Sequence, residues 1–340
     1  MICSLPAQSS QRGVVLMPLR SKMWMSLCTS CLIIFGSSSS SYSTVSKKKL
    51  STTVHQVQPL PTQKKHTYLR VMTLNIAHGG NNFMGLPPFL RGAQGIRTNL
   101  QQTAAVLKRE RPDVVGLQEA DASSWWSGQF HHVHYLAKRA GYPFSVHGIH
   151  VKDKGKAYGT ALLSRSQPKH ARSHIFNGAT LFPKGFVIAS VPWPGLPKKR
   201  VDIISLHLHP TSRATQRAQV LALIRFVLKR KRPHIIVGDF NCQWYGKQSP
   251  LRLLKQKLGL HTYRPFNPYY NTHRTSNKRI DWIFVPKIFV IRNYRVLKDQ
   301  VSDHYPVVAD IYWKRWAPPP KKPTSAPTSH PSKLYHAPPL

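Results

Sequence analysis

The sequence predicts an α/β fold in which two mostly antiparallel β-sheets pack face to face and helices cover the outside. Eight short β-rich runs alternate with few helical patterns, which favours two sheets. The chain is 41% hydrophobic with 8 Trp, 13 Tyr and 13 Phe in 340 residues, which excludes wholesale disorder. Three of its four cysteines lie within the first 31 residues, so the core rather than disulfides must hold the fold.

The elements are expected within 67–313, which is predicted to be the folded domain. The strand candidates, in order, are Tyr68–Ile76, Val114–Gln118, Thr160–Ser164, Phe186–Val191, Val201–Leu208, Ile235–Val237, Ile280–Val285 and Pro306–Tyr312. One helix is expected before Pro112, with apolar residues at helical spacing at Ile96, Leu100, Ala104 and Leu107. A second is expected after Ser212 and before Pro233, with apolar residues at Ala214, Ala218, Leu221, Ile224 and Leu228.

The two flanks differ from this domain in composition. Residues 1–66 contain eight basic and no acidic residues, and an apolar stretch at Met23–Gly36 follows a basic pair. That pattern is typical of a secretory signal followed by a disordered linker, so we expect a secreted or periplasmic protein, with a membrane anchor as the alternative. Residues 314–340 hold eight prolines and five basic residues, which predicts a disordered tail; a partner-binding role is the alternative.

The charge balance limits the partners. Lys and Arg number 50 against 11 acidic residues, and the stretch 67–313 alone keeps 37 basic and all 11 acidic residues, a net charge of +26. Such a domain would bind nucleic acid through its phosphates. It would equally attract anionic phospholipid headgroups, or reflect adaptation to an acidic milieu. Charge alone therefore does not identify the substrate. The sequence implies no protein partner, and we expect a monomer.

The few carboxylates stand at strand ends. Glu119 follows an apolar strand as Leu-Gln-Glu, Asp239 follows another in Gly-Asp-Phe-Asn, and Asp281 lies in Arg-Ile-Asp. Asp303 stands in Ser-Asp-His and Asn75 in Leu-Asn-Ile. Side chains at strand ends can project into a common cleft. Oxygen ligands suit Mg²⁺, and histidines beside them can transfer protons. We therefore expect this cleft to bind a divalent cation and a phosphodiester substrate.

These blocks, in this order, resemble the endonuclease/exonuclease/phosphatase superfamily of DNase I-like enzymes. The resemblance runs from about Tyr68 to Tyr312 and includes Asn-Ile, Gln-Glu, Leu-His, Gly-Asp-Phe-Asn, Arg-Ile-Asp and Ser-Asp-His. It implies a four-layer α/β sandwich and a metal-dependent phosphodiesterase using Mg²⁺, with Mn²⁺ as a substitute. Residue by residue, it implies that Glu119 binds the metal with help from Asn75 and Asp303.

The same resemblance implies the catalytic residues. Asp239 and Asn241 would position the attacking water and contact the scissile phosphate. His304 would be the catalytic histidine, oriented and charged by Asp281. His207 would be a second histidine at the phosphate.

This sequence also departs from the family pattern. Abasic-site nucleases carry an acidic residue at the place of Ala77, which weakens a DNA-repair assignment, and His78 follows it. DNase-like members pair the counterpart of His207 with a glutamate, but the stretch Lys154–Thr160 holds no acid. His209 faces the same side as His207 if its strand continues, and ranks lower.

Several residues have structural alternatives. Asp281 can pair with Arg279 instead of a histidine. The histidines between His131 and His150 lack carboxylates at ligand spacing, so we expect them to be solvated or core residues. A stacking platform of Trp125, Trp126 and Tyr135 is as plausible as a core role, and Cys242 is expected to be a buried hydrophobe.

We therefore expect a metal-dependent phosphodiesterase that acts on nucleic acid. A phospholipid or inositol-phosphate hydrolase is the alternative. A catalytically silent basic binding module or toxin subunit on the same fold is a further alternative.

Overall fold

The computed structural model describes residues 50–59, 66–81, 88–178, 183–246 and 248–318. The signal-like segment and the proline-rich segment beyond residue 318 lie outside this part, so both expectations stay predictions. No helix among the described residues is long and apolar enough to cross a membrane.

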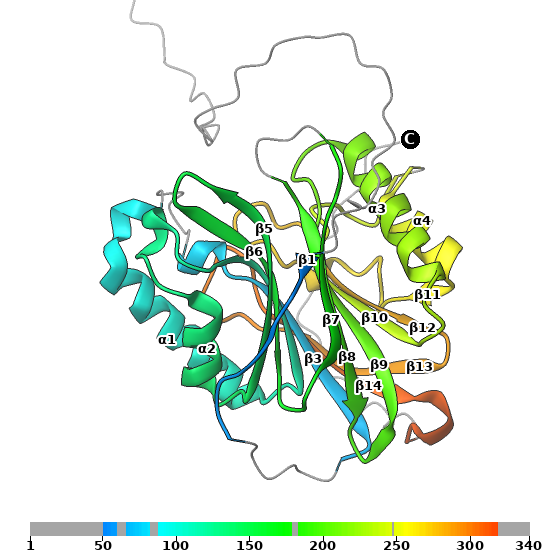
Figure 1. Cartoon of the computed structure of the whole chain (residues 1–340). Helices are drawn as coiled ribbons and strands as arrows, with labels where there is room; N and C mark the ends of the chain where they lie inside the picture. Colours follow the sequence, from blue (N-terminus) through cyan, green and yellow to red (C-terminus); the bar gives the residue numbers. More distant parts are fainter. Residues whose placement is uncertain (1–49, 60–65, 82–87, 179–182, 247, 319–340) are drawn as a thin grey trace, which may run out of the picture. The chain divides into compact units, whose positions relative to one another are not determined.

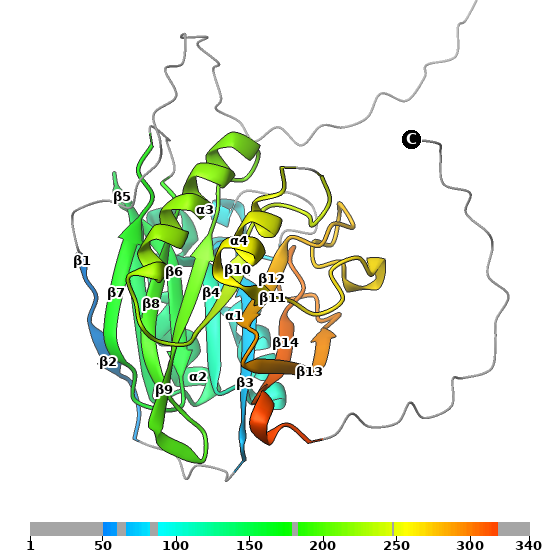
Figure 2. The ribbon, with the colours of Figure 1, turned by 90° about the vertical axis from the view of Figure 1, so that its right-hand side faces the viewer.

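The described chain between Leu50 and Pro318 is built as four layers, with helices outside two packed sheets (Figures 1 and 2). One seven-stranded sheet has the order β13-β14-β3-β4-β6-β5-β2. Its strands are β2 Val54–Gln56, β3 Tyr68–Asn75, β4 Val114–Asp121, β5 Phe144–Asp153, β6 Lys156–Ser164, β13 Phe289–Val296 and β14 Val307–Trp313. Helices α1 Gly92–Glu110 and α2 His132–Ala140 cover its outer face.

The other seven-stranded sheet has the order β1-β7-β8-β9-β10-β12-β11. Its strands are β1 Leu50–Ser51, β7 Lys169–Ile175, β8 Gly185–Trp193, β9 Leu196–His207, β10 His234–Asp239, β11 Leu260–His261 and β12 Asp281–Pro286. Helices α3 Arg213–Leu228 and α4 Pro250–Leu258 cover its outer face. Short 3₁₀ turns are η1 Ala77–Gly79, η2 Pro88–Arg91, η3 Trp125–Ser127, η4 Pro268–Tyr270 and η5 Lys314–Trp316.

Apolar clusters fill the spaces between the layers. Val71 and Val114 of one sheet pack with Ile203 and Ile235 of the other in the central cluster. Separate clusters join each pair of helices to its own sheet. The predicted four-layer α/β sandwich is therefore confirmed.

All eight expected strands are present, with ends shifted by a few residues. The helix expected after Ser212 begins there because the Ser212 side chain accepts a hydrogen bond from the Thr215 backbone N–H. Strands such as β5 and β13 were not expected, because histidine, lysine or arginine interrupts their apolar alternation. Helix α2 was missed for the same reason.

Part of residues 1–66, expected to include a disordered linker, instead forms a β-strand. Strand β2 pairs antiparallel with β5. Beside it, Gln58 donates from Nε2 to the carbonyl oxygens of Ala137 (3.0 Å) and Lys138 (2.7 Å). These contacts add an edge strand that polar composition alone does not predict.

Candidate active site

Strand ends from both sheets supply the site. Parallel strands β3 and β4 set Asn75 beside Gln118, and parallel strands β9 and β10 set His207 beside Asp239. Antiparallel β12 places Asp281 opposite Asp239. The two sheets are joined here, because Asn75 Nδ2 donates to Asp239 Oδ2 at 3.1 Å.

A buried histidine–aspartate pair lies at the centre. His304 Nδ1 lies 2.8 Å from Asp281 Oδ2 and donates to it, while His304 Nε2 lies 3.8 Å from Asp239 Oδ2. Thr272 Oγ1 accepts hydrogen bonds from the backbone N–H groups of Ile280 and Asp281, which fixes the start of β12. Burial acts to lower the pKa of His304, but Asp281 and Asp239 outweigh it and raise that pKa well above its usual value. The pair therefore holds a cationic imidazole.

Asp239 and Asn241 form a tight turn after β10. Asp239 Oδ1 accepts from the Asn241 backbone N–H at 2.8 Å, and Asn241 adopts a left-handed φ of 51°. Burial raises the pKa of Asp239 to about 7, against the opposing effect of His304. A carboxylate with such a pKa can exchange a proton near neutral pH.

His207 is neutral in this setting. Lys184 Nζ lies 3.3 Å from its Nδ1, and Asn241 Nδ2 lies 3.0 Å from its Nε2. Nε2 also lies 3.3 Å from Asp239 Oδ2, so a neutral ring can carry its proton on Nε2 and accept from Lys184 at Nδ1, which a protonated ring cannot do. Burial, with the charge of Lys184, lowers the pKa of His207 well below its usual value. The charged side chain next to His207 Nδ1 is therefore a lysine.

Glu119 faces several nitrogen groups. It sits in a bulge of β4, between Leu117 and Ala120, with a left-handed φ of 50°. Its Oε1 lies 3.9 Å from Lys184 Nζ and 4.0 Å from His207 Nε2. Backbone strain of this kind is typical of functional sites.

His78 was not predicted as a site residue, although its place three residues after Asn75 was a usable signal. Its Nε2 lies 3.6 Å from Glu119 Oε2, and its Nδ1 lies 2.7 Å from Asp121 Oδ2. Asp121 was missed as well, because its role depends on the β4 bulge. The structure therefore has a second histidine–aspartate pair beside Glu119.

Asp303 lies beside the central histidine, His304. One of its carboxylate oxygens is within 4.8 Å of ring nitrogens of both His273 and His304. Asp239, Asp281 and His304 form a second group of this kind. Asp303 Oδ1 accepts from Ser302 Oγ at 3.1 Å, and its metal-binding role stays a prediction. His273 is a further residue that the sequence did not single out.

The donor set fits a divalent cation. Carboxylate and amide oxygens are the usual ligands of Mg²⁺ and Mn²⁺, and neutral imidazole suits transition metals. One oxygen of Asp281, Oδ1, is buried and has no hydrogen-bond partner. Asp281 therefore offers one oxygen atom that the described contacts leave unsatisfied.

Three alternatives from the sequence are resolved by contacts. Arg279 does not pair with Asp281; its guanidinium donates to the carbonyl oxygens of Tyr263 and Arg264 and to the Tyr294 hydroxyl. Strand β9 ends at His207, and His209 Nδ1 accepts from the Ser212 backbone N–H at 3.0 Å, which is a structural role. Burial raises the pKa of Cys242 to about 12, so its thiol stays protonated.

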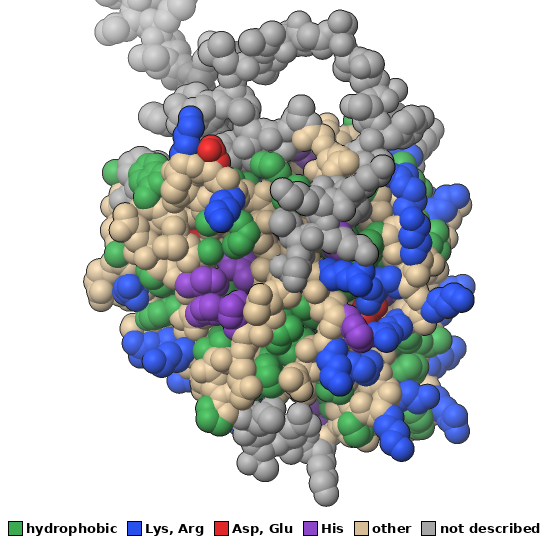
Figure 3. All heavy atoms as spheres, viewed as in Figure 1, with side chains coloured by type: hydrophobic (Ala, Val, Ile, Leu, Met, Phe, Trp, Pro, Cys, Tyr) green, Lys and Arg blue, Asp and Glu red, His purple; other side chains and the backbone are tan. Residues whose placement is uncertain are grey.

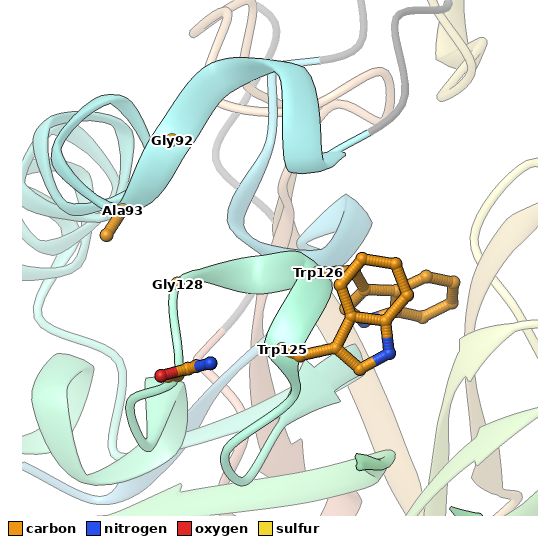
Figure 4. A pocket seen from close by; sticks show the side chains of 6 residues that line it. Gly92, Ala93, Trp125, Trp126 and Gly128 are labelled. Carbon is orange, nitrogen blue, oxygen red and sulfur yellow. The ribbon is translucent and has the colours of Figure 1, made fainter. Parts of the chain in front are cut away.

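An aromatic pocket adjoins the second histidine–aspartate pair, because Trp126 lines the pocket and also packs against His78. Its volume is about 240 Å³, and Gly92, Ala93, Trp125, Trp126, Gly128 and Gln129 line it (Figure 4). The Trp126 ring lies 4.8 Å from the His78 ring, and Trp125 is 51% exposed. Tyr135 packs against Phe130 instead, so of these three aromatic residues only the two tryptophans line the pocket.

Comparisons with known proteins give one family. The family model described as "Endonuclease/Exonuclease/phosphatase family" matches residues 72–304. No curated protein matches this chain. Among solved structures, an endonuclease/exonuclease/phosphatase from Beutenbergia cavernae DSM 12333 is 22% identical with a TM-score of 0.56, covering 73% of this chain and 72% of that one.

Two other similar structures have more specific names. The human Nocturnin catalytic domain with bound sulfate is 18% identical with a TM-score of 0.53, covering 77% of this chain and 98% of that one. The Bacteroides thetaiotaomicron VPI-5482 mannosyl-6-phosphatase Bt3783 is 16% identical with a TM-score of 0.53, covering 72% and 100%. At these identities the structures show the fold alone, while the family model covers most of the chain. The chain belongs to the endonuclease/exonuclease/phosphatase family and is a hydrolase of phosphoester bonds.

Proposed function

We propose that this chain is a Mg²⁺-dependent phosphodiesterase that cleaves nucleic acid, with Mn²⁺ able to replace Mg²⁺. The observation that carries the proposal is the buried group of His304, Asp281 and Asp239 beside Glu119. It places a cationic imidazole next to a carboxylate that titrates near neutral pH. The carboxylate can accept a proton from water, and the cationic imidazole can stabilise negative charge on the phosphoryl oxygens.

The residues divide the chemical work. Asp239 takes the proton from the attacking water, and Asn75 and the Asn241 backbone hold its two oxygens in place. His304, kept cationic by Asp281, stabilises the charge that develops on the phosphoryl oxygens. Asn241 and neutral His207 are positioned to contact the same oxygens. A divalent cation bound at Glu119, with Asn75 and Asp303, would polarise the phosphate and stabilise the leaving oxygen.

The substrate is inferred from charge. The stretch 67–313 carries a net charge of +26, and Figure 3 shows many Lys and Arg side chains on one face with few acidic ones among them. A polyanion gains affinity from many such groups at once, which supports nucleic acid over a small phosphate monoester. The aromatic pocket lined by Trp125 and Trp126 offers a surface on which a base could stack.

The test compares substrates on the full-length chain. Supercoiled plasmid DNA, single-stranded RNA, vesicles of phosphatidylserine and phosphatidylinositol, and 4-nitrophenyl phosphate are each incubated with wild type and His304→Ala. Cleavage of a nucleic acid that falls at least 100-fold in the variant is the expected result. Hydrolysis of the vesicle lipids alone would establish the phospholipid alternative. Binding of DNA without cleavage of any substrate would establish the silent binding module.

A further inference from the structure

His78 occupies an unusual backbone position beside the metal site. It lies in η1 with φ 55° and ψ 31°, between Ala77 at φ 44° and Gly79 at φ 78°. Left-handed conformations at non-glycine residues are costly and cluster at sites where function requires them. Its side chain is only 15% exposed. The chain thus accepts strain to bring this ring next to Glu119.

The orientation of the His78 ring is fixed from several sides. Nδ1 donates to Asp121 Oδ2 at 2.7 Å, and Asp121 Oδ1 accepts from Trp126 Nε1 at 3.0 Å. The rings of Trp126 and Tyr158 each lie 4.8 Å from the imidazole ring. The Asp121 carboxylate is fully buried, so it cannot readily turn away. Nε2 is therefore left facing Glu119.

The gap between His78 and Glu119 is too long for a hydrogen bond. Nε2 lies 3.6 Å from Glu119 Oε2, whereas N–H···O bonds span about 2.7–3.2 Å. Two ligands that each lie about 2.1 Å from a common ion are about 3.0–3.5 Å apart. A histidine whose other ring nitrogen donates to a carboxylate is the usual arrangement of a metal ligand.

We propose that His78 Nε2 is a ligand of the divalent cation bound at Glu119, and that Asp121 orients it. The inference rests on the proposed metal-dependent function. A nitrogen ligand raises the affinity for Mn²⁺ relative to Mg²⁺, because imidazole binds transition metals better than it binds a hard ion. This chain should therefore prefer Mn²⁺ more strongly than a site of oxygen ligands alone.

The test measures metal binding rather than turnover. Full-length metal-free protein, labelled with ¹⁵N-histidine, is titrated with Mn²⁺ and with Mg²⁺ by calorimetry, and the Mn²⁺ complex is examined by electron spin-echo spectroscopy. His78→Gln should lose a coordinated-nitrogen coupling and bind Mn²⁺ about 10–100-fold more weakly, with a smaller loss for Mg²⁺. Asp121→Asn should weaken Mn²⁺ binding in the same direction. Exposed His170→Gln is the matched control and should change neither.

The outcomes separate the two proposals. Unchanged nitrogen coupling and unchanged Mn²⁺ affinity in folded His78→Gln would overturn the ligand role, even if the enzyme cleaves DNA. If His78→Gln does not fold, unchanged Mn²⁺ binding in Asp121→Asn overturns it instead. A His78-dependent coupling in a protein that hydrolyses no phosphodiester would leave the ligand standing and refute the proposed function. Failure of the wild type to bind Mn²⁺ refutes both.

Discussion

Replacing Asp281 with asparagine tests the catalytic pair most selectively. The two side chains have nearly the same shape, so the change removes a charge while leaving the volume in the buried strand end almost unchanged. Asp281 Oδ2 accepts from His304 Nδ1 at 2.8 Å, and the backbone N–H of Asp281 is held separately by Thr272. The variant should therefore fold, with His304 deprived of the carboxylate that keeps it cationic.

The size of the effect follows from that contact. A hydrogen bond to a charged group contributes about 1.5–3 kcal/mol, against about 0.5–1.5 kcal/mol for a neutral pair. The loss of about 1–1.5 kcal/mol alone corresponds to roughly a 5- to 13-fold lower rate. The lost attraction between the buried charges adds to this. We expect kcat to fall about 100-fold or more, up to the roughly 10³-fold that one charge-stabilising donor supplies.

The assay is single-turnover cleavage of the best substrate at saturating protein, with thermal unfolding as a check of the fold. Asp299→Asn is the matched control, because Asp299 pairs with Arg109 at 2.7 Å in an exposed pair. The control should keep wild-type turnover. A folded Asp281→Asn protein that turns over at the wild-type rate would refute the role assigned to the pair.

Further predictions concern the neighbouring groups. Lys184→Met should raise the pKa of His207, because the lysine charge helps to lower it. Titration of the His207 ring by NMR in metal-free protein measures this pKa, and an unchanged value would contradict the prediction. Burial lowers the pKa of His131 to about 4, so the unfolded chain binds more protons than the folded one between about pH 6.5 and 4. Stability is therefore full above that window and falls on acidification, by up to about 1.4 kcal/mol per pH unit. His131→Asn should flatten this slope in urea unfolding at pH 7 and pH 5, and an unchanged slope would contradict the assignment. Gly238→Ala should strongly destabilise the protein, because Gly238 has a φ of 147° and an added Cβ would clash with the Leu206 carbonyl oxygen. An unchanged melting temperature would contradict this prediction.

The sequence predicts the fold class and the central strands because these are short, apolar and buried on both faces. It also predicts which carboxylates stand at strand ends, since Asp239 and Asp281 follow directly from the strand pattern. Pairing across the sheets then brings Asn75 to Asp239, as the shared strand ends suggested.

What the sequence does not predict depends on backbone geometry. His78 reaches Glu119 only because η1 is left-handed and β4 bulges, and neither feature has a clear local signature. Lys184 meets His207 because the start of β8 lies beside the end of β9, with Gly185 opposite His207. Strand β5 was missed because its histidines interrupt the apolar pattern; one of them, His147, contacts His131 at 3.4 Å.

The most direct test of the central claim is metal-dependent cleavage of plasmid DNA under single-turnover conditions. Full-length wild type and His304→Ala are stripped with chelator, and Mg²⁺ or Mn²⁺ is then added back in steps. We expect no cleavage in chelator, a saturable return of activity in wild type, and a rate at least 100-fold lower in the variant at the same metal concentration. Cleavage that persists in excess chelator, or equal rates for the two proteins, would contradict it.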